Sequence, residues 1–188
     1  MGQLIQFEDR ALARLRERLG EAEEATEDLI AFARGHSDAV ASIHAAVLVA
    51  IEAPSVDRLL EAVTRRWPEI LGIDAVAVAI VVGERGFRAD CGVIDRVEAA
   101  FVERMLLEAP PVDVRSVGGG HPLFGSSASA RIRAEALIRI DFAAPFPRGL
   151  LALGQEAELA LDSSHGSELL RFLGKTLGAT LRRFVATA

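Results

Sequence analysis

The chain of 188 residues contains one cysteine, Cys91, and no tyrosine. A single cysteine excludes an intramolecular disulfide and a zinc site built from cysteines, because each needs two thiolates or more. Lysine and arginine are outnumbered by aspartate and glutamate, 21 to 27, which gives a formal net charge of −6. This excess of negative charge, with no basic run, disfavours nucleic acid and anionic membrane as partners. We therefore expect neither partner, and we expect a reducing, cytoplasmic location.

Long apolar runs are also missing from the sequence. The longest stretches, such as "AVAVAIVVG", fall well short of the roughly 20 residues that cross a bilayer. The first 20 residues carry charges every few positions, unlike the apolar core of a signal peptide. With 51% hydrophobic and 26% charged residues, the chain can bury a sizeable core. Its length favours one domain with an extension.

The motifs of common catalytic and metal sites are absent as well. The histidines lie at positions 36, 44, 121 and 165 without an H-E-x-x-H pair, so we expect no metal and no cofactor. No G-x-S-x-G is present, and Cys91 lies beside Asp90, whose charge raises the pKa of a neighbouring thiol. We expect Cys91 to be a buried packing residue in a strand, and the protein to be no enzyme.

The first third of the chain repeats every seven residues. Positions with three-four spacing from Ile5 to Ala50 are mostly apolar, with Glu8, Thr26 and His36 as polar exceptions, and the flanking positions are heavily charged. This pattern is typical of a helix that pairs with another helix. We expect a long dimerising helix over residues 1–53. The alternative is a helix that folds back on its own domain. The predicted dimerisation residues are Ile5, Leu12, Leu15, Leu19 and Leu29.

The remaining residues, 54–188, alternate between helical and strand patterns. Ser55 is a candidate N-cap for a helix whose buried face carries Leu59, Leu60, Val63 and Trp67. The segment "DAVAVAIVVG" is typical of a central strand buried on both faces, and "GERG" can turn the chain into a strand "FRADCGVI".

The second half of this region continues the mixed pattern. We expect a helix over "DRVEAAFVERMLLEAP", with Val97 and Phe101 inward, then strands at "PVDVRSV", "EALIRIDF" and "PRGLLALGQE". A closing helix places five leucines inward, from Leu169 to Leu181. The elements together predict an α+β domain, an antiparallel sheet flanked by helices.

The order of these elements resembles a GAF domain, a small sensory α+β module. More specifically, the chain is similar to the bacterial domain of unknown function 484 family, a GAF-like family with a preceding coiled-coil helix. The matching stretches include "DRALARLRERLGEAEEATEDLIAFARGH", "RMLLEAPPVDVRSVGGGHPLFG" and "GLLALGQEAELALDSSHGSELLRFLG". Phe124 stands where members tend to carry a cysteine. The resemblance implies a GAF-like fold, a homodimer and a sensory or regulatory role, without catalytic residues.

Charged residues inside predicted strands are the candidate ligand contacts. A charge in an apolar strand needs solvent, a counter-charge or a ligand. Strand alternation places Arg139 and Leu137 on one face, and Arg88 and Asp90 likewise share a face. If these faces coincide, the sheet presents a polar pocket floor. The alternative is cross-strand salt bridging on an exposed face.

The loop "GGGHPLFG", residues 118–125, has no lysine, and Pro122 lacks a donor, so a phosphate loop is not expected. We expect a pocket rim in which Leu123 and Phe124 either cap the core or cover a ligand. The function expected is a homodimeric GAF-like sensory module that binds a small molecule on one sheet face. The alternative is a ligand-free scaffold that binds a protein partner. The candidate ligand-binding residues are Arg88, Arg115, His121, Phe124 and Arg139.

Overall fold

The computed structural model describes residues 20, 23–24, 27, 35–108, 110–140, 148–157 and 163–186. The chain divides into two compact units, Met1–Ala41 and Ser42–Ala188. The described residues of the first unit are helical. The predicted dimerisation residues lie outside the described part of the chain, so their role stays a prediction: Ile5, Leu12, Leu15, Leu19 and Leu29.

The second unit is built on one six-stranded sheet in which every neighbouring pair is antiparallel. The strand order is β3-β2-β1-β6-β5-β4, so β1 and β6 lie at the centre. This sheet and its flanking helices confirm the predicted α+β fold. The strands are β1 (Ala75–Val82), β2 (Arg85–Asp90), β3 (Val93–Glu98), β4 (Val112–Ser116), β5 (Ala134–Ile140) and β6 (Arg148–Gln155).

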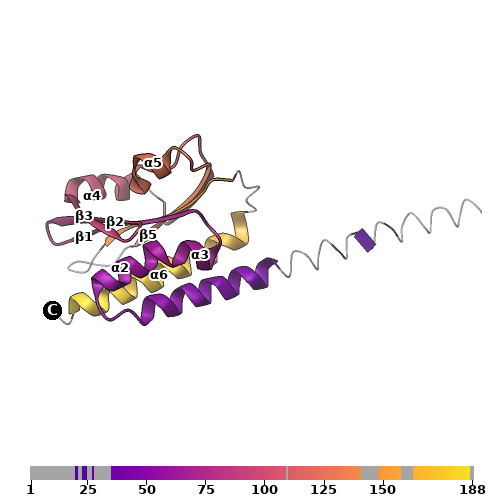
Figure 1. Ribbon diagram of the computed structural model, residues 1–188, viewed down its shortest axis with the longest axis horizontal. Coiled ribbons are helices and arrows are strands. Elements are labelled where there is room, and N and C mark those ends of the chain that lie inside the picture. Colours follow the sequence, from indigo (N-terminus) through magenta and orange to yellow (C-terminus); the bar gives the residue numbers. More distant parts are fainter. Residues whose placement is uncertain are drawn as a thin grey trace, which may run out of the picture. The chain divides into compact units, whose positions relative to one another are not determined.

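Helices cover both faces of the sheet (Figure 1). The helical residues 42–51 pack on one face together with α2 (Val56–Arg65), α3 (Trp67–Leu71) and α6 (Ser163–Ala186). The opposite face carries α4 (Ala99–Glu108), the short 3-10 helix η1 (Pro122–Phe124) and α5 (Gly125–Ser129). Three of the predicted inward leucines of α6 are buried, which confirms that helix and its face: Leu173, Leu177 and Leu181.

Strand β1 is buried on both faces, as its continuous apolar sequence predicts. Its larger residues, Val76, Val78 and Ile80, face the helices 42–51, α2 and α6. Ala77 and Ala79 face α4 and η1. Because side chains alternate along a strand, β1 turns larger side chains to one face and, from Ala75 to Ala79, only alanines to the other.

The end of the heptad repeat packs against its own domain. Ile43, Val47 and Ala50, three residues of the predicted seam, are at most 9% exposed and lie in the same core cluster as α2 and α6. The Nε1–H of Trp67 donates to the Ala46 carbonyl oxygen at 2.9 Å, which fixes this helix against α3. Residues 42–51 therefore follow the alternative of a helix folded onto its domain. Residues 42–53 belong to the second compact unit, which begins at Ser42.

The helix after Pro54 begins where the sequence predicts. The Ser55 hydroxyl oxygen accepts a hydrogen bond from the Arg58 backbone N–H at 3.3 Å, as an N-cap does. The predicted face of Leu59, Leu60, Val63 and Trp67 is buried. The helix divides after α2, because the proline in the next turn has no N–H to donate to the preceding turn.

Residues 91–98 differ from the prediction. The expected strand "FRADCGVI" ends at Asp90, and a turn at Cys91 and Gly92 leads into β3. The four residues "DRVE", expected to begin a helix, belong to β3 instead, so Val97 lies in a strand. β3 pairs residue for residue with β2. That pairing outweighs the weak strand propensity of aspartate, arginine and glutamate.

Candidate functional site

The strand register places several charged side chains on the sheet face that α4, η1 and α5 cover. Arg88 is paired with Ala79, and Arg139 with Leu150, and both apolar partners lie in the core cluster beneath α4. Cross-strand partners point to the same side of a sheet. The faces predicted from strand alternation therefore coincide. The charged side chains of the strands on this face are Arg88, Asp90, Asp95, Asp113, Arg115, Glu135, Arg139 and Arg148.

These side chains do not form one pocket. Arg88 lies on β2 and Arg115 on β4, and three strands separate β2 from β4. At about 4.8 Å between neighbouring strands, the two backbones lie about 19 Å apart. The charged residues predicted to bind a ligand thus fall into two groups on the same face, one toward each edge of the sheet. Arg139, on β5, is partly buried, and its backbone N–H donates to the Pro111 carbonyl oxygen at 3.1 Å.

The first group is an ion pair within β2. Arg88 Nη2 lies 3.5 Å from Asp90 Oδ2, and the two side chains are 26% and 14% exposed. The Arg88 Nε and the Asp90 Oδ1 are buried without a hydrogen-bond partner. Gly125, with a φ of +75°, passes so close that a Cβ there would lie 3.4 Å from both side chains. A buried donor and a buried acceptor that lie side by side can both form hydrogen bonds with one polar ligand.

The second group centres on Glu135, which the sequence did not single out. Its side chain is 1% exposed. One carboxylate oxygen accepts from Arg115 Nε at 2.9 Å and Nη2 at 2.7 Å, and the other accepts from the His121 backbone N–H at 2.6 Å. Charge-assisted bonds of this kind are stronger than neutral ones. Glu135 therefore anchors the start of the loop that precedes η1, and Arg115 serves the fold through it.

The residues after this anchor fill the centre of the sheet face. Leu123 and Phe124 are 0% and 1% exposed and lie in the core cluster beneath α4. A Cβ on Gly154 would lie 2.9 Å from the Phe124 Cζ, so the ring rests against the β6 backbone. Of the two roles expected for this loop, the residues cap the core. We call Leu123, Phe124 and Ile132 the plug, since they occupy the space above the small residues of β1 and β6.

His121 contributes to the structure of this loop. Its Nδ1 accepts a hydrogen bond from the Leu123 backbone N–H at 3.3 Å and so caps η1. Burial lowers the pKa of His121, the Glu135 carboxylate opposes that shift, and Arg115 reinforces it. The neutral imidazole is therefore the form that suits the cap, because a protonated Nδ1 cannot accept.

Cys91 is not the buried strand residue that the sequence predicts. It is exposed, and it occupies a turn with a φ of +48°. The turn is held by Thr64, whose hydroxyl oxygen accepts from the Gly92 N–H at 2.9 Å, and by Arg65, whose Nε donates to the Cys91 carbonyl oxygen at 3.2 Å. Partial burial of the thiol group raises the pKa of Cys91, although the residue as a whole is exposed, and Asp90 adds to the shift through a hydrogen bond and its charge. A raised pKa makes this thiol a weak nucleophile.

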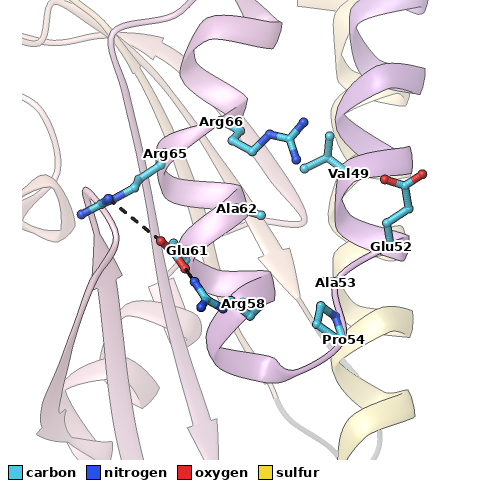
Figure 2. A pocket seen from close by; sticks show the side chains of 9 residues that line it. All are labelled: Val49, Glu52, Ala53, Pro54, Arg58, Glu61, Ala62, Arg65 and Arg66. Carbon is cyan, nitrogen blue, oxygen red and sulfur yellow. Dashed lines mark hydrogen bonds and ion pairs between the residues drawn. The ribbon is translucent and has the colours of Figure 1, made fainter.

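A groove lies on the opposite side of the sheet, between the helical residues 42–51 and α2 (Figure 2). Its volume is about 380 Å³. Glu61 pairs with Arg58 at 2.6 Å and with Arg65 at 4.0 Å, while Arg66 reaches across the groove toward Val49 (Figure 2). The lining residues are Val49, Glu52, Ala53, Pro54, Arg58, Glu61, Ala62, Arg65 and Arg66.

Among the residues that the structure describes, no three His, Cys, Asp or Glu side chains gather as metal ligands would. None of the described helices is both long and apolar enough to traverse a lipid bilayer.

Comparisons with known proteins identify the fold. A family model for "Protein of unknown function, DUF484" matches residues 1–186. No curated protein matches the chain. Among solved structures, bacteriophytochrome RpBphP3 from R. palustris is similar, with a TM-score of 0.53 and 13% identity over 78% of this chain and 38% of that one. The GAF domain of a protein assigned as a sensor histidine kinase, from Pseudomonas syringae pv. tomato, has a TM-score of 0.50 and 14% identity, over 85% and 97% of the two chains. These similarities show a GAF-like fold.

Proposed function

The chain belongs to this family of proteins of unknown function, and we propose that it is a non-catalytic regulatory module of the GAF-like type that acts as a cytoplasmic homodimer. The fold is one that sensory proteins use, which supports a regulatory role. The observation that carries the proposal is an exposed apolar surface on residues 42–51 and α6. We call it the outer surface, and its residues are Leu48, Ile51 and Phe172.

The outer surface is exposed although the helix that carries it is otherwise well packed. Leu48 is 60% exposed, and Ile51 and Phe172 are each 45% exposed. Ile51 and Phe172 line one groove of about 440 Å³, so the two helices present a continuous surface. Covering the three side chains would contribute about 3 kcal/mol per copy. That gain has to exceed the free-energy cost of association. The predicted seam from Ile5 to Leu29 would supply a second contact between the two chains and so add to the gain.

A second copy of the chain is the occupant that fits this surface best. In a two-fold dimer the same patch faces itself, so Leu48, Ile51 and Phe172 would meet their own counterparts. The other residues of the Phe172 groove are Thr176, Ala179 and Thr180, which are uncharged, and the cations Lys175 and Arg183. Arg183 Nη2 donates to the carbonyl oxygens of Ile51 and Ala53 at 3.2 and 3.1 Å, so part of this guanidinium is bound within the chain. The plug supports a module that works through such protein contacts, since it occupies the centre of the other face.

One observation favours small-molecule binding as a second function. The buried Arg88 Nε and Asp90 Oδ1 lack hydrogen-bond partners. A compound with an acceptor beside a donor would satisfy both atoms. A thermal-shift series with nucleotides, amino acids and organic acids tests this function. Small-molecule binding requires that at least one compound raises the melting temperature and that Arg88→Met abolishes this rise. If no compound raises the melting temperature, small-molecule binding is excluded.

Sedimentation velocity tests the proposed dimer. We expect the full chain to sediment as a dimer at tens of micromolar, and Leu48→Glu to shift it toward monomer, because an unpaired carboxylate would be buried at the contact. Leu107→Glu is the matched control, since Leu107 is 87% exposed on α4 at the other sheet face. A monomeric wild-type chain, or equal dissociation by both variants, contradicts the proposal.

A further inference from the structure

The groove between residues 42–51 and α2 differs in charge from the chain as a whole. Three arginines and two glutamates line it, a formal charge of +1 in a chain of net charge −6. Its volume of about 380 Å³ falls within the range of small-molecule pockets. The cationic lining and the size together favour a small anion.

The charges of the groove are unequally neutralised. Glu61 is shared between Arg58 at 2.6 Å and Arg65 at 4.0 Å. Arg65 also donates from Nε to the Cys91 carbonyl oxygen at 3.2 Å, which turns part of its guanidinium toward β2. Arg66 has no ion pair or hydrogen bond from its side chain to any residue that the structure describes. One guanidinium at the groove is therefore available to an outside acceptor.

The wall opposite Arg66 carries the apolar Val49 side chain and the Glu52 carboxylate (Figure 2). The Arg66 guanidinium points toward the Val49 side chain, and Ala62 lies on the same helix one turn before Arg66 (Figure 2). Ala53 and Pro54 close the groove below. A guanidinium binds a carboxylate through two parallel hydrogen bonds, and an adjacent apolar wall takes up a hydrocarbon group.

We propose that this groove is a binding site for a small organic carboxylate, whose charged group binds Arg66 and whose apolar part lies against Val49, Ala62 and Pro54. The site is on the helical side of the sheet, separate from the Arg88–Asp90 pair and from the plug. It goes beyond the proposed function. Val49 and the outer-surface residues Leu48 and Ile51 belong to the same helical segment, residues 42–51, so an occupied groove contacts the element proposed to dimerise.

An NMR titration of the ¹⁵N-labelled full chain with sodium benzoate tests the site. We expect saturable shifts of the backbone amides of Val49, Ala62 and Arg66, with a dissociation constant on the order of 1 mM. Benzamide, which has the same ring without the charge, should produce no saturable shift at these amides. Sodium chloride at equal ionic strength controls for screening.

Variants separate a built site from a general attraction of anions. Arg66→Gln should weaken benzoate binding about tenfold or more, because a charge-assisted pair is lost. Arg104→Gln removes the same charge from an exposed position of α4, on the other sheet face, and should leave binding unchanged. Ala62→Leu, which fills the groove while retaining every charge, should also abolish binding.

Several results would overturn the site. They are the absence of saturable shifts, equal shifts with benzamide, or an affinity that Arg66→Gln leaves intact. The titration reports on residues of the groove whatever the oligomeric state, whereas sedimentation reports on the dimer without any ligand. Failure of one proposal is therefore distinguishable from failure of the other.

Discussion

Replacing Phe124 by alanine tests whether the plug is part of the core. Phe124 is 1% exposed, and substitutions of this kind cost about 3–5 kcal/mol of unfolding free energy. The cost depends on how far the site can collapse. A Cβ on Gly154 would lie 2.9 Å from the Phe124 Cζ, so the ring sits against the backbone of a central strand that is paired on both sides. That floor cannot move toward the cavity without loss of ladder hydrogen bonds.

We therefore expect Phe124→Ala to cost at least about 4 kcal/mol, in the upper half of the range. For a chain of this length the melting temperature should fall by roughly 8–16 °C. Urea unfolding followed by circular dichroism measures the difference, at one fixed protein concentration because dimerisation adds to apparent stability. The control Leu107→Ala, at a side chain 87% exposed, should change the free energy by about 0.5 kcal/mol or less. A loss below about 1.5 kcal/mol for Phe124→Ala would refute the plug as a core element.

Two further predictions concern the anchor of the same loop. Glu135→Gln keeps the shape of the side chain but removes its charge, and we expect a loss of about 1.5 kcal/mol in urea unfolding, since Arg115 retains Asp113 at 3.1 Å. Stability equal to wild type would contradict the anchor. Burial lowers the pKa of His121 from its usual 6.5, so the unfolded chain binds a proton there more readily than the folded one. The free energy of unfolding should therefore rise with pH just below 6.5 and level off above it. His121→Asn keeps a capping acceptor and should flatten that rise, and an unchanged pH profile would disprove the assignment.

Much of the fold follows from local patterns in the sequence. The β-branched run of β1 predicts a strand buried on both faces, and the spacing of Leu173, Leu177 and Leu181 predicts the packed face of α6. Ser55 marks the beginning of α2. In each case the decisive interaction lies within about one helical turn or follows from strand periodicity. The element can therefore be predicted from the sequence of this chain alone.

The errors arose where a distant partner decides the structure. "DRVE" forms a strand because β2 lies beside it, and Cys91 is exposed because Gly92 and Thr64 complete a turn there. Glu135 is a charged residue in an otherwise apolar strand, and the same signal singled out Arg139 in the sequence. Its pairing with Arg115 depends on the register of β4 and β5, which the sequence does not encode locally.

The candidate sites were harder to predict than the fold. Strand alternation placed Arg88 and Arg139 on the correct face, but only the strand order separates Arg88 from Arg115. The groove at Arg66 has no sequence motif, because its two walls come from segments joined by a turn at Pro54. The outer surface was hidden by the heptad pattern, which drew attention to Ile43 and Val47 rather than to Leu48.

The central claim, a homodimer formed through the outer surface, is tested most directly by isotope-filtered NMR on a mixture of labelled and unlabelled chains. The claim predicts intermolecular nuclear Overhauser effects from the Leu48 and Ile51 methyl groups to the Phe172 ring. A monomeric sample at NMR concentration, or a dimer whose intermolecular contacts leave these three side chains out, would contradict it.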